Sequence, residues 1–282
     1  MKTAHGVEPA GLSEPSGVWR ASSRSSHQPR WTIGDFFDDD TLAAWGDVDL
    51  LRPASGGVRN AVWFAHVNGA PCVVRRSKRA DAALVWELDV IEAVRNYGLG
   101  APALIPTTAG ERSFEGVVVH ERVDGRPPVS HGDWAAVAEY LATLHSRLRN
   151  VEQRPGFRSS VDLLATEAGG DVDLSHMPNE AGARCRAAWA RLRGRDTSLI
   201  HGDPGKDNIL VTAEGVVLVD WDESRVDAAL LDLAALPEGV SPLDDEERWV
   251  ATQAASAWGA AVSWRVEPDY ARKRLAEVAP AV

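Results

Sequence analysis

The stretch SLIHGDPGKDNILVTAEGVVLVDWDES, residues 198–224, decides how the fold of this chain is interpreted. It sets charged and amide side chains beside two short apolar runs, NILVT and VVLVDW, which are joined by the tight turn Ala-Glu-Gly. Two strands joined by such a turn pair antiparallel, so the start of the first lies beside the end of the second. We therefore expect Asn208 and Asp220 to lie close together at one end of a hairpin, with Asp203 approaching through the loop before it.

These three side chains have the chemistry that phosphoryl transfer requires. An amide oxygen and a carboxylate at one end of a hairpin suit Mg²⁺, which binds a few protein oxygens and completes its shell with water and phosphate. Asn208 and Asp220 are therefore the candidate metal ligands. A third carboxylate outside the metal shell, that of Asp203, can accept the proton of a hydroxyl group. Positioning and charge neutralisation supply most of the rate of such a transfer.

Each of these residues also has a purely structural interpretation. Asp203 could cap its loop, and Asn208 and Asp220 could be turn residues. An aspartate at the end of an apolar strand needs a partner, however, and this favours the functional interpretation. We interpret His201 as structural, because Asp203 is better placed to act on a hydroxyl. Asp222 is an alternative member of the metal shell.

The same residues carry a resemblance to a known family. The run His201-Gly-Asp-Pro-Gly-Lys-Asp-Asn208, followed by Leu218-Val-Asp220-Trp-Asp, resembles the aminoglycoside phosphotransferase and choline kinase-like family, which is related to the protein kinases. The family pattern is HGDxxxxN and then an apolar strand that ends in Asp. The likeness extends over residues 45–236. It implies an α+β, two-lobed protein-kinase-like fold, ATP and Mg²⁺ as cofactors, and transfer of phosphate to a hydroxyl of a small molecule.

The resemblance also implies a nucleotide site in the N-terminal part. Ser55-Gly56-Gly57-Val58-Arg59-Asn60 looks like the family's glycine turn, whose backbone N–H groups can cradle phosphate oxygens. Arg75 stands where protein kinases have a strand lysine. Strand alternation puts it on the face toward the nucleotide and the competing Arg76 on the other face. Glu87, inside the following helix, looks like the glutamate that pairs with this cation.

Further matches concern the adenine and the supporting loops. His120-Glu121-Arg122-Val123 resembles the hinge segment, in which the backbone C=O of Glu121 and N–H of Val123 would hold the adenine edge. Leu144-His145 matches a structural pair of the family, and Asp232 resembles an aspartate that fixes the loop after the metal site. Lys206 departs from the protein-kinase pattern, because it follows Asp203 by three residues instead of two.

Composition and secondary-structure signals divide the chain into three parts. Residues 1–30 are rich in Ser, Gly and Pro and are expected to be a disordered tail. Residues 31–124 carry strand signals and one helix, which predicts a small β-rich N-lobe; the resemblance implies that this lobe binds the nucleotide. Residues 125–282 are helical with a β-hairpin inside, which predicts a larger C-lobe; the resemblance places the catalytic loop, the metal site and the acceptor pocket there. The expected elements are strands 61–67, 71–76 and 116–123, helices 83–98, 134–148 and 181–194, and an Asn68-Gly69 turn.

Composition excludes several classes of protein. The 282 residues carry 30 basic and 41 acidic side chains, and 30 − 41 = −11. Such a balance argues against binding to nucleic acid or to an anionic membrane surface. No apolar run is long enough to span a membrane, and no secretory signal is visible near the N-terminus. Two isolated cysteines, Cys72 and Cys185, indicate a reducing compartment, so we expect a cytoplasmic protein. We expect it to be a monomer or a homodimer.

The acceptor is the least determined part of this hypothesis. Residues 223–282 hold 6 basic and 11 acidic side chains, which favours a cationic hydroxylated compound such as an aminoglycoside, and thus a role in antibiotic resistance. A metabolic acceptor such as choline, an amino sugar or homoserine is the first alternative. A nucleotide-binding module without catalytic activity is the second.

Overall fold

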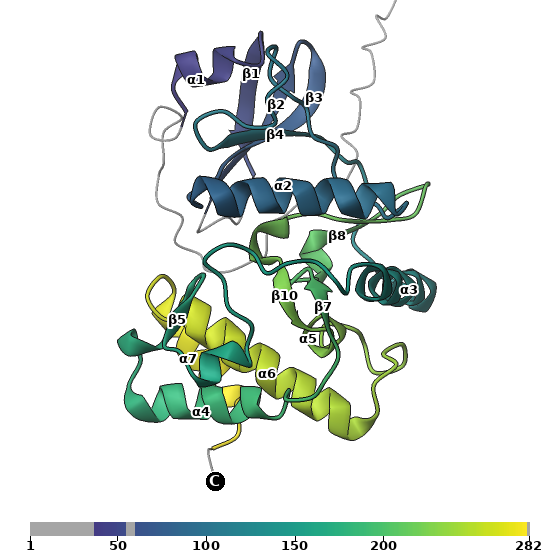
Figure 1. Ribbon diagram of the computed structural model, residues 1–282. Coiled ribbons are helices and arrows are strands. Elements are labelled where there is room, and N and C mark those ends of the chain that lie inside the picture. The colour runs from purple at the N-terminus through teal and green to yellow at the C-terminus, as the bar shows by residue number, and fades with distance from the viewer. Residues whose placement is uncertain (1–36, 55–59, 281–282) are drawn as a thin grey trace, which may run out of the picture.

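The computed structural model describes residues 37–54 and 60–280, and in Figure 1 these form two lobes, one above the other. The upper, N-terminal lobe contains a four-stranded sheet and one long helix, and the lower lobe is mainly helical. This confirms the expected α+β, two-lobed arrangement. The expected tail, residues 1–30, lies outside the described residues, and the lobe boundary at residue 124 stays a prediction.

In chain order, the described part of the N-terminal lobe has one short helix, three strands, one long helix and a fourth strand, and the longer elements that follow are helices. The elements are α1 (Asp39–Ala43), β1 (Val48–Pro53), β2 (Ala61–Val67), β3 (Ala70–Arg76), α2 (Asp81–Asn96), β4 (Val117–Glu121), α3 (His131–Arg147), β5 (Ala168–Gly169), β6 (Val172–Asp173), α4 (Asn179–Ala190), β7 (Thr197–Ile200), β8 (Ile209–Val211), β9 (Val216–Leu218), β10 (Arg225–Ala228), α5 (Leu230–Leu233), α6 (Asp245–Ser263) and α7 (Pro268–Glu277).

The N-terminal sheet is antiparallel, with the strand order β1-β2-β3-β4. The β2–β3 hairpin turns at Asn68 and Gly69, and both residues have the positive φ angles that a tight two-residue turn of this kind requires. The resulting register pairs Val62 with Arg75. Strand β1 was not among the expected elements, because its exposed face gives it little apolar signal.

Helix α2 lies between the sheet and the C-terminal lobe (Figure 1). Its apolar residues recur at helical spacing and are buried, which is why this segment becomes a helix and faces inward. They include Leu84, Leu88, Ile91 and Val94. The helix stops just before Gly98, whose positive φ is a common way for a chain to leave a helix. Glu87 lies on the same buried face, although it is a carboxylate.

The C-terminal lobe is built around its long helices. Helix α3 begins with a capping box, in which the Ser130 hydroxyl accepts from the Asp133 amide and the Asp133 side chain accepts from the Ser130 amide. Trp189 of α4 and Trp258 of α6 pack with ring centroids 6.1 Å apart in the core. The β8–β9 hairpin was expected, but the pairing of β7 with β10 was not. None of the described helices has the length and apolar character needed to cross a bilayer.

Candidate active site

The β8–β9 hairpin brings Asn208 and Asp220 to the same end, as its sequence predicts. Ile209 pairs with Leu218, and the next amide, that of Val219, donates to the Asn208 carbonyl across 3.0 Å. Asp220 follows Val219 directly, so its backbone leaves the hairpin at the position of Asn208. This register places an amide side chain and a carboxylate beside each other at the edge of the cleft between the lobes.

The Asn208 side chain has a fixed orientation. Its Nδ2 donates to the Asp203 carbonyl across 2.9 Å and to the Asp203 carboxylate across 3.1 Å. Because both groups of Asp203 can only accept, the side-chain nitrogen of Asn208 must face them. The opposite atom, Asn208 Oδ1, is buried and has no hydrogen-bond partner among the described residues. An orphaned buried oxygen of this kind is destabilising unless a cation or another donor occupies its neighbourhood.

Asp220 has a strained backbone and a perturbed carboxyl group. Its φ is positive and lies in the left-handed region, which is uncommon for residues other than glycine and is concentrated at functional sites. The pKa of Asp220 is raised to about 7, chiefly by burial. The negative charges of Asp222 and Asp203 act in the same direction, and the positive charge of Arg75 opposes them. A carboxylate in such surroundings gains from a nearby cation. The donor set of Asn208 Oδ1 and Asp220 therefore fits a hard cation such as Mg²⁺.

This donor set is sparse, as expected for magnesium. In residues 37–54 and 60–280, no group of three or more His, Cys, Asp or Glu side chains is arranged to hold a metal ion. Mg²⁺ characteristically keeps several waters and takes only one or two protein carboxylates together with substrate phosphates. A site made of one amide and one carboxylate is consistent with that habit.

Asp232 organises the loop that carries Asp203. Its buried carboxylate accepts from the amides of His201 (2.8 Å) and Gly202 (2.9 Å) and contacts His145 Nε2 at 3.1 Å. Burial would raise the pKa of Asp232, but the hydrogen bond and charge of His145 hold it below its ordinary value. The expectation that Asp232 fixes the loop after the metal site is therefore wrong. It fixes the loop before that site, because its carboxylate reaches back to the end of β7.

His201 and Gly202 have structural roles in the same loop. His201 is fully buried, and its Nε2 lies 3.0 Å from the Val219 carbonyl, which can only accept, so this nitrogen carries the proton. Burial lowers the pKa of His201. Gly202 has a positive φ, and a Cβ there would collide with the carbonyl oxygen of Glu223, so only glycine fits. These contacts hold Asp203 beside the β9 end.

A pocket that is partly open to solvent lies between the lobes next to this loop. Four residues expected at the nucleotide site line it, namely Arg75, Glu87, Glu121 and Val123, together with the candidate metal ligand Asp220. Most of the accessible lining of this pocket is apolar, as a nucleobase requires. The structure thus brings Arg75 of β3, the segment Glu121–Val123 and the candidate metal ligand Asp220 to one pocket.

Arg75 and Glu87 form the expected buried ion pair between β3 and α2. Arg75 Nη1 also lies 3.4 Å from Asp222 Oδ1. Burial would raise the pKa of Asp222, but the charges of Arg79 and Arg75 hold it well below its ordinary range. With both of its carboxylate oxygens engaged by arginines, Asp222 is poorly suited to the metal shell that we considered for it.

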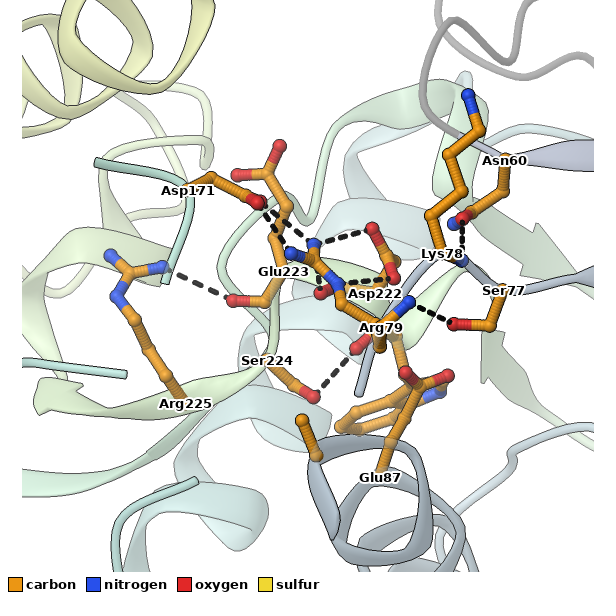
Figure 2. A network of polar contacts seen from close by, with 12 residues as sticks. Asn60, Ser77, Lys78, Arg79, Glu87, Asp171, Asp222, Glu223, Ser224 and Arg225 are labelled. Carbon is orange, nitrogen blue, oxygen red and sulfur yellow. Dashed lines mark hydrogen bonds and ion pairs between the residues drawn. The ribbon is translucent and has the colours of Figure 1, made fainter. Parts of the chain in front are cut away.

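Two arginines that form ion pairs beside the site were not identified from the sequence. Figure 2 shows Arg79 between Asp171 and Asp222, and it pairs with both carboxylates. Arg154 is 1% exposed and donates to Glu87 Oε2 across 2.7 Å. Both arginines lie in irregular segments without periodicity, in a chain that contains many arginines. No local signal could have separated them from the others.

The remaining expected residues are distributed as follows. Ser55, Gly56 and Gly57 lie outside the described residues. Asn60 accepts from the Lys78 amide across 3.4 Å (Figure 2). It also lines a second cavity near Arg79. Lys206 is exposed at the surface of the loop.

Comparisons with known proteins identify the same fold. The sequence profile of the phosphotransferase enzyme family matches residues 50–274. Choline kinase LicA from Streptococcus pneumoniae superposes with a TM-score of 0.59 at 16% identity, covering 84% of this chain and 94% of that one. A thermostable mutant of aminoglycoside phosphotransferase APH(4)-Ia gives 0.60 at 16% identity, covering 85% and 96%. A microcompartment-associated aminopropanol kinase gives 0.56 at 17% identity, covering 84% and 92%. No curated protein sequence matches.

The profile covers well over half of the chain, and the solved structures share its two lobes. The chain therefore has a protein-kinase-like fold and belongs to the phosphotransferase enzyme family.

Proposed function

We propose that this protein is an ATP- and Mg²⁺-dependent kinase that phosphorylates a hydroxyl group of a small molecule. The observation that carries the proposal is the convergence of Asp203, Asn208 and Asp220 at one end of the β8–β9 hairpin, beside a pocket between the lobes. No purely structural role explains an amide whose nitrogen is satisfied twice while its buried oxygen has no partner among the described residues.

In this proposal Asp203 is the general base. Its carboxylate is partly exposed and its loop is fixed by Asp232, so it can orient an acceptor hydroxyl and take its proton. The hydroxyl oxygen forms a bond to the γ-phosphorus, and the bond between that phosphorus and the bridging oxygen of ADP breaks. The products are a phosphate monoester and ADP.

The nucleotide would occupy the pocket that Arg75, Glu121 and Val123 line. The Glu121 carbonyl and Val123 amide would hold the adenine edge, and Arg75 would contact the inner phosphates through its planar fork. The turn Ser55–Asn60 would lie over the phosphates. The backbone amides of a glycine-rich turn suit anionic oxygens.

The metal ligands would be Asn208 Oδ1 and Asp220. A bound Mg²⁺ supplies neutralisation of the phosphate charge. The contribution of the protein is the fixed amide orientation of Asn208 and the constrained backbone of Asp220.

We assign the acceptor to the C-terminal lobe, where Asp203 can reach its hydroxyl group. The acidic balance of residues 223–282 supports a cationic hydroxylated compound, such as an aminoglycoside. Solved relatives of similar fold include an amicoumacin kinase with AMP-PNP and Ca²⁺ (TM-score 0.52) and APH(4)-Ia with ADP and hygromycin B (TM-score 0.56). A metabolic acceptor such as choline, an amino sugar or homoserine is the alternative within the same chemistry.

The test is mass-detected phosphate transfer from ATP to a panel of aminoglycosides, peptide antibiotics, choline, amino alcohols, amino sugars and homoserine, with and without Mg²⁺. We expect a phosphate monoester on at least one hydroxylated amine, only in the presence of Mg²⁺. Binding of Mg-ATP without transfer to any acceptor, and without slow ATP hydrolysis, would favour a nucleotide-binding module without catalytic activity.

A further inference from the structure

Arg154 belongs to the C-terminal lobe but makes its strongest contacts with the N-terminal one. It donates to Glu87 Oε2 across 2.7 Å and to the Ala83 carbonyl across 3.1 Å, both on α2. On its own side it donates to the carbonyls of Asp222 (2.7 Å) and Ser224 (3.3 Å). A guanidinium with this many partners, 1% exposed, has one conformation.

The segment Glu152–Arg154 is fastened on two sides. The side-chain amide of Gln153 binds the backbone of β10: its Nε2 donates to the Val226 carbonyl (2.7 Å), and its Oε1 accepts from the Val226 amide (3.0 Å). Toward the other lobe, the Trp86 indole donates to the Glu152 carbonyl across 2.9 Å. The segment therefore connects β10 rigidly to α2, and Arg154 is its charged end.

The charges around Glu87 show what this connection achieves. Glu87 Oε1 pairs with Arg75 and Oε2 pairs with Arg154, so one carboxylate is shared by two cations. The three groups sum to +2 − 1 = +1. Without Arg154, the charges of Glu87 and Arg75 would cancel, and no positive charge of this group would remain for the phosphates. Asp222 is itself balanced by Arg79 across 2.7 Å.

We propose that Arg154 is a positioning residue for the nucleotide: it holds Glu87 from the opposite lobe and leaves the charge of Arg75 available to the triphosphate. Arg75 lines the pocket between the lobes, whereas Arg154 is outside its lining. The effect of Arg154 therefore passes through Glu87. The inference rests on the proposed function, because it requires a nucleotide in that pocket.

The experiment compares ATP and adenosine binding to Arg154→Met by calorimetry in the presence of Mg²⁺. Adenosine reports the base pocket alone, and ATP also reports the phosphate contacts. We expect ATP affinity to fall about tenfold or more, the size expected when Glu87, released from Arg154, cancels the charge of Arg75 beside the phosphates at protein-like dielectric. Adenosine affinity should stay within about twofold. Arg154→Lys keeps the charge without the fork and should lie between wild type and Met.

Two further variants separate positioning from general damage. Arg225→Met removes another buried arginine, which pairs with Asp227 at 3.0 Å inside the C-terminal lobe, and should destabilise the protein without changing the ratio of ATP to adenosine affinity. In a Glu87→Gln background, Arg154→Met should weaken ATP binding by less than twofold further, because its target is already neutral.

The outcomes are distinguishable. Equal ATP affinity in wild type and Arg154→Met, or an equal loss for ATP and adenosine, would overturn the inference while the proposed function stands. If Arg154→Met does not fold, an Arg154→Lys variant with an unchanged ratio of ATP to adenosine affinity would overturn it equally. A wild-type protein that binds no ATP would overturn the proposed function itself, and the inference with it.

Discussion

Asn208 and Asp203 form one hydrogen-bonded unit, in which the amide of the first donates to both the carbonyl and the carboxylate of the second, across 2.9 and 3.1 Å. The proposed base and one proposed metal ligand are therefore positioned together. A displacement of either changes the other, so their effects on catalysis should not be additive.

Replacing Asp203 with Asn should remove the proton acceptor and keep the nucleotide site. Turnover should fall about 10²- to 10⁴-fold, the usual contribution of a positioned base, while ATP affinity changes little. Steady-state kinetics together with calorimetry measure both quantities. Asp207→Asn, on the same loop, is the matched control and should keep turnover. Wild-type turnover in the Asp203 variant would remove it as the base.

Replacing Asp220 with Ala should abolish the part of nucleotide binding that depends on Mg²⁺. The variant loses a carboxylate ligand, while the apolar lining of the pocket remains. Calorimetry of ATP with and without Mg²⁺ should give two equal, weak affinities, and adenosine should bind as to the wild type. If Mg²⁺ still strengthened ATP binding to the variant, the metal would have other ligands.

Replacing Asp232 with Ala should destabilise the fold by about 3 kcal/mol or more. The change leaves the amides of His201 and Gly202 without an acceptor in a buried place, and each such group costs about 1–3 kcal/mol. Urea unfolding followed by circular dichroism measures the loss. Asp244→Ala, which removes an exposed helix cap, serves for comparison and should cost only about 1 kcal/mol. Equal losses would mean that Asp232 does not organise the loop.

Stability should decrease as the pH falls below about 6.5, in part because of His120. Burial, followed by the charge of Arg75, lowers the pKa of His120 to about 3, whereas the unfolded chain binds the proton near the ordinary value of 6.5. The unfolded state therefore binds more protons between these values, and the stabilisation present above pH 6.5 is lost on acidification. Urea unfolding at pH 7 and pH 5 should show a smaller loss in His120→Gln than in wild type. Equal losses would contradict the assignment.

The sequence was informative wherever local pattern and chemistry coincide. The β2–β3 turn at Asn68-Gly69, the apolar face of α2 and the β8–β9 hairpin follow from propensity and periodicity, and the structure has them all. Asn208 and Asp220 could be placed together because a tight hairpin fixes its own register. The family pattern supplied the rest of the expected site.

The unexpected features all depend on contacts between distant segments. Arg154 reaches Glu87 across 67 positions, and Arg79 reaches Asp222 across 143. Asp232 binds the loop before the metal site because β10 pairs with β7, a pairing between two four-residue strands that carries no hairpin signal. Sequence periodicity describes one element at a time, so it cannot reveal which irregular segment satisfies a buried charge.

The hydrogen bonds and the ion pair between Glu152–Arg154 and α2 have a consequence for biosynthesis. As the polypeptide leaves the ribosome, the first four strands and α2 emerge before any residue that can neutralise Glu87 on its second oxygen. The carboxylate and its arginine then stay hydrated at the open underside of the helix until residue 154 arrives, and that residue is held only after Val226 has been made. We therefore expect α2 to reach its native packing only after the last third of the chain has been made. A fragment that ends near residue 124 should be poorly ordered around α2.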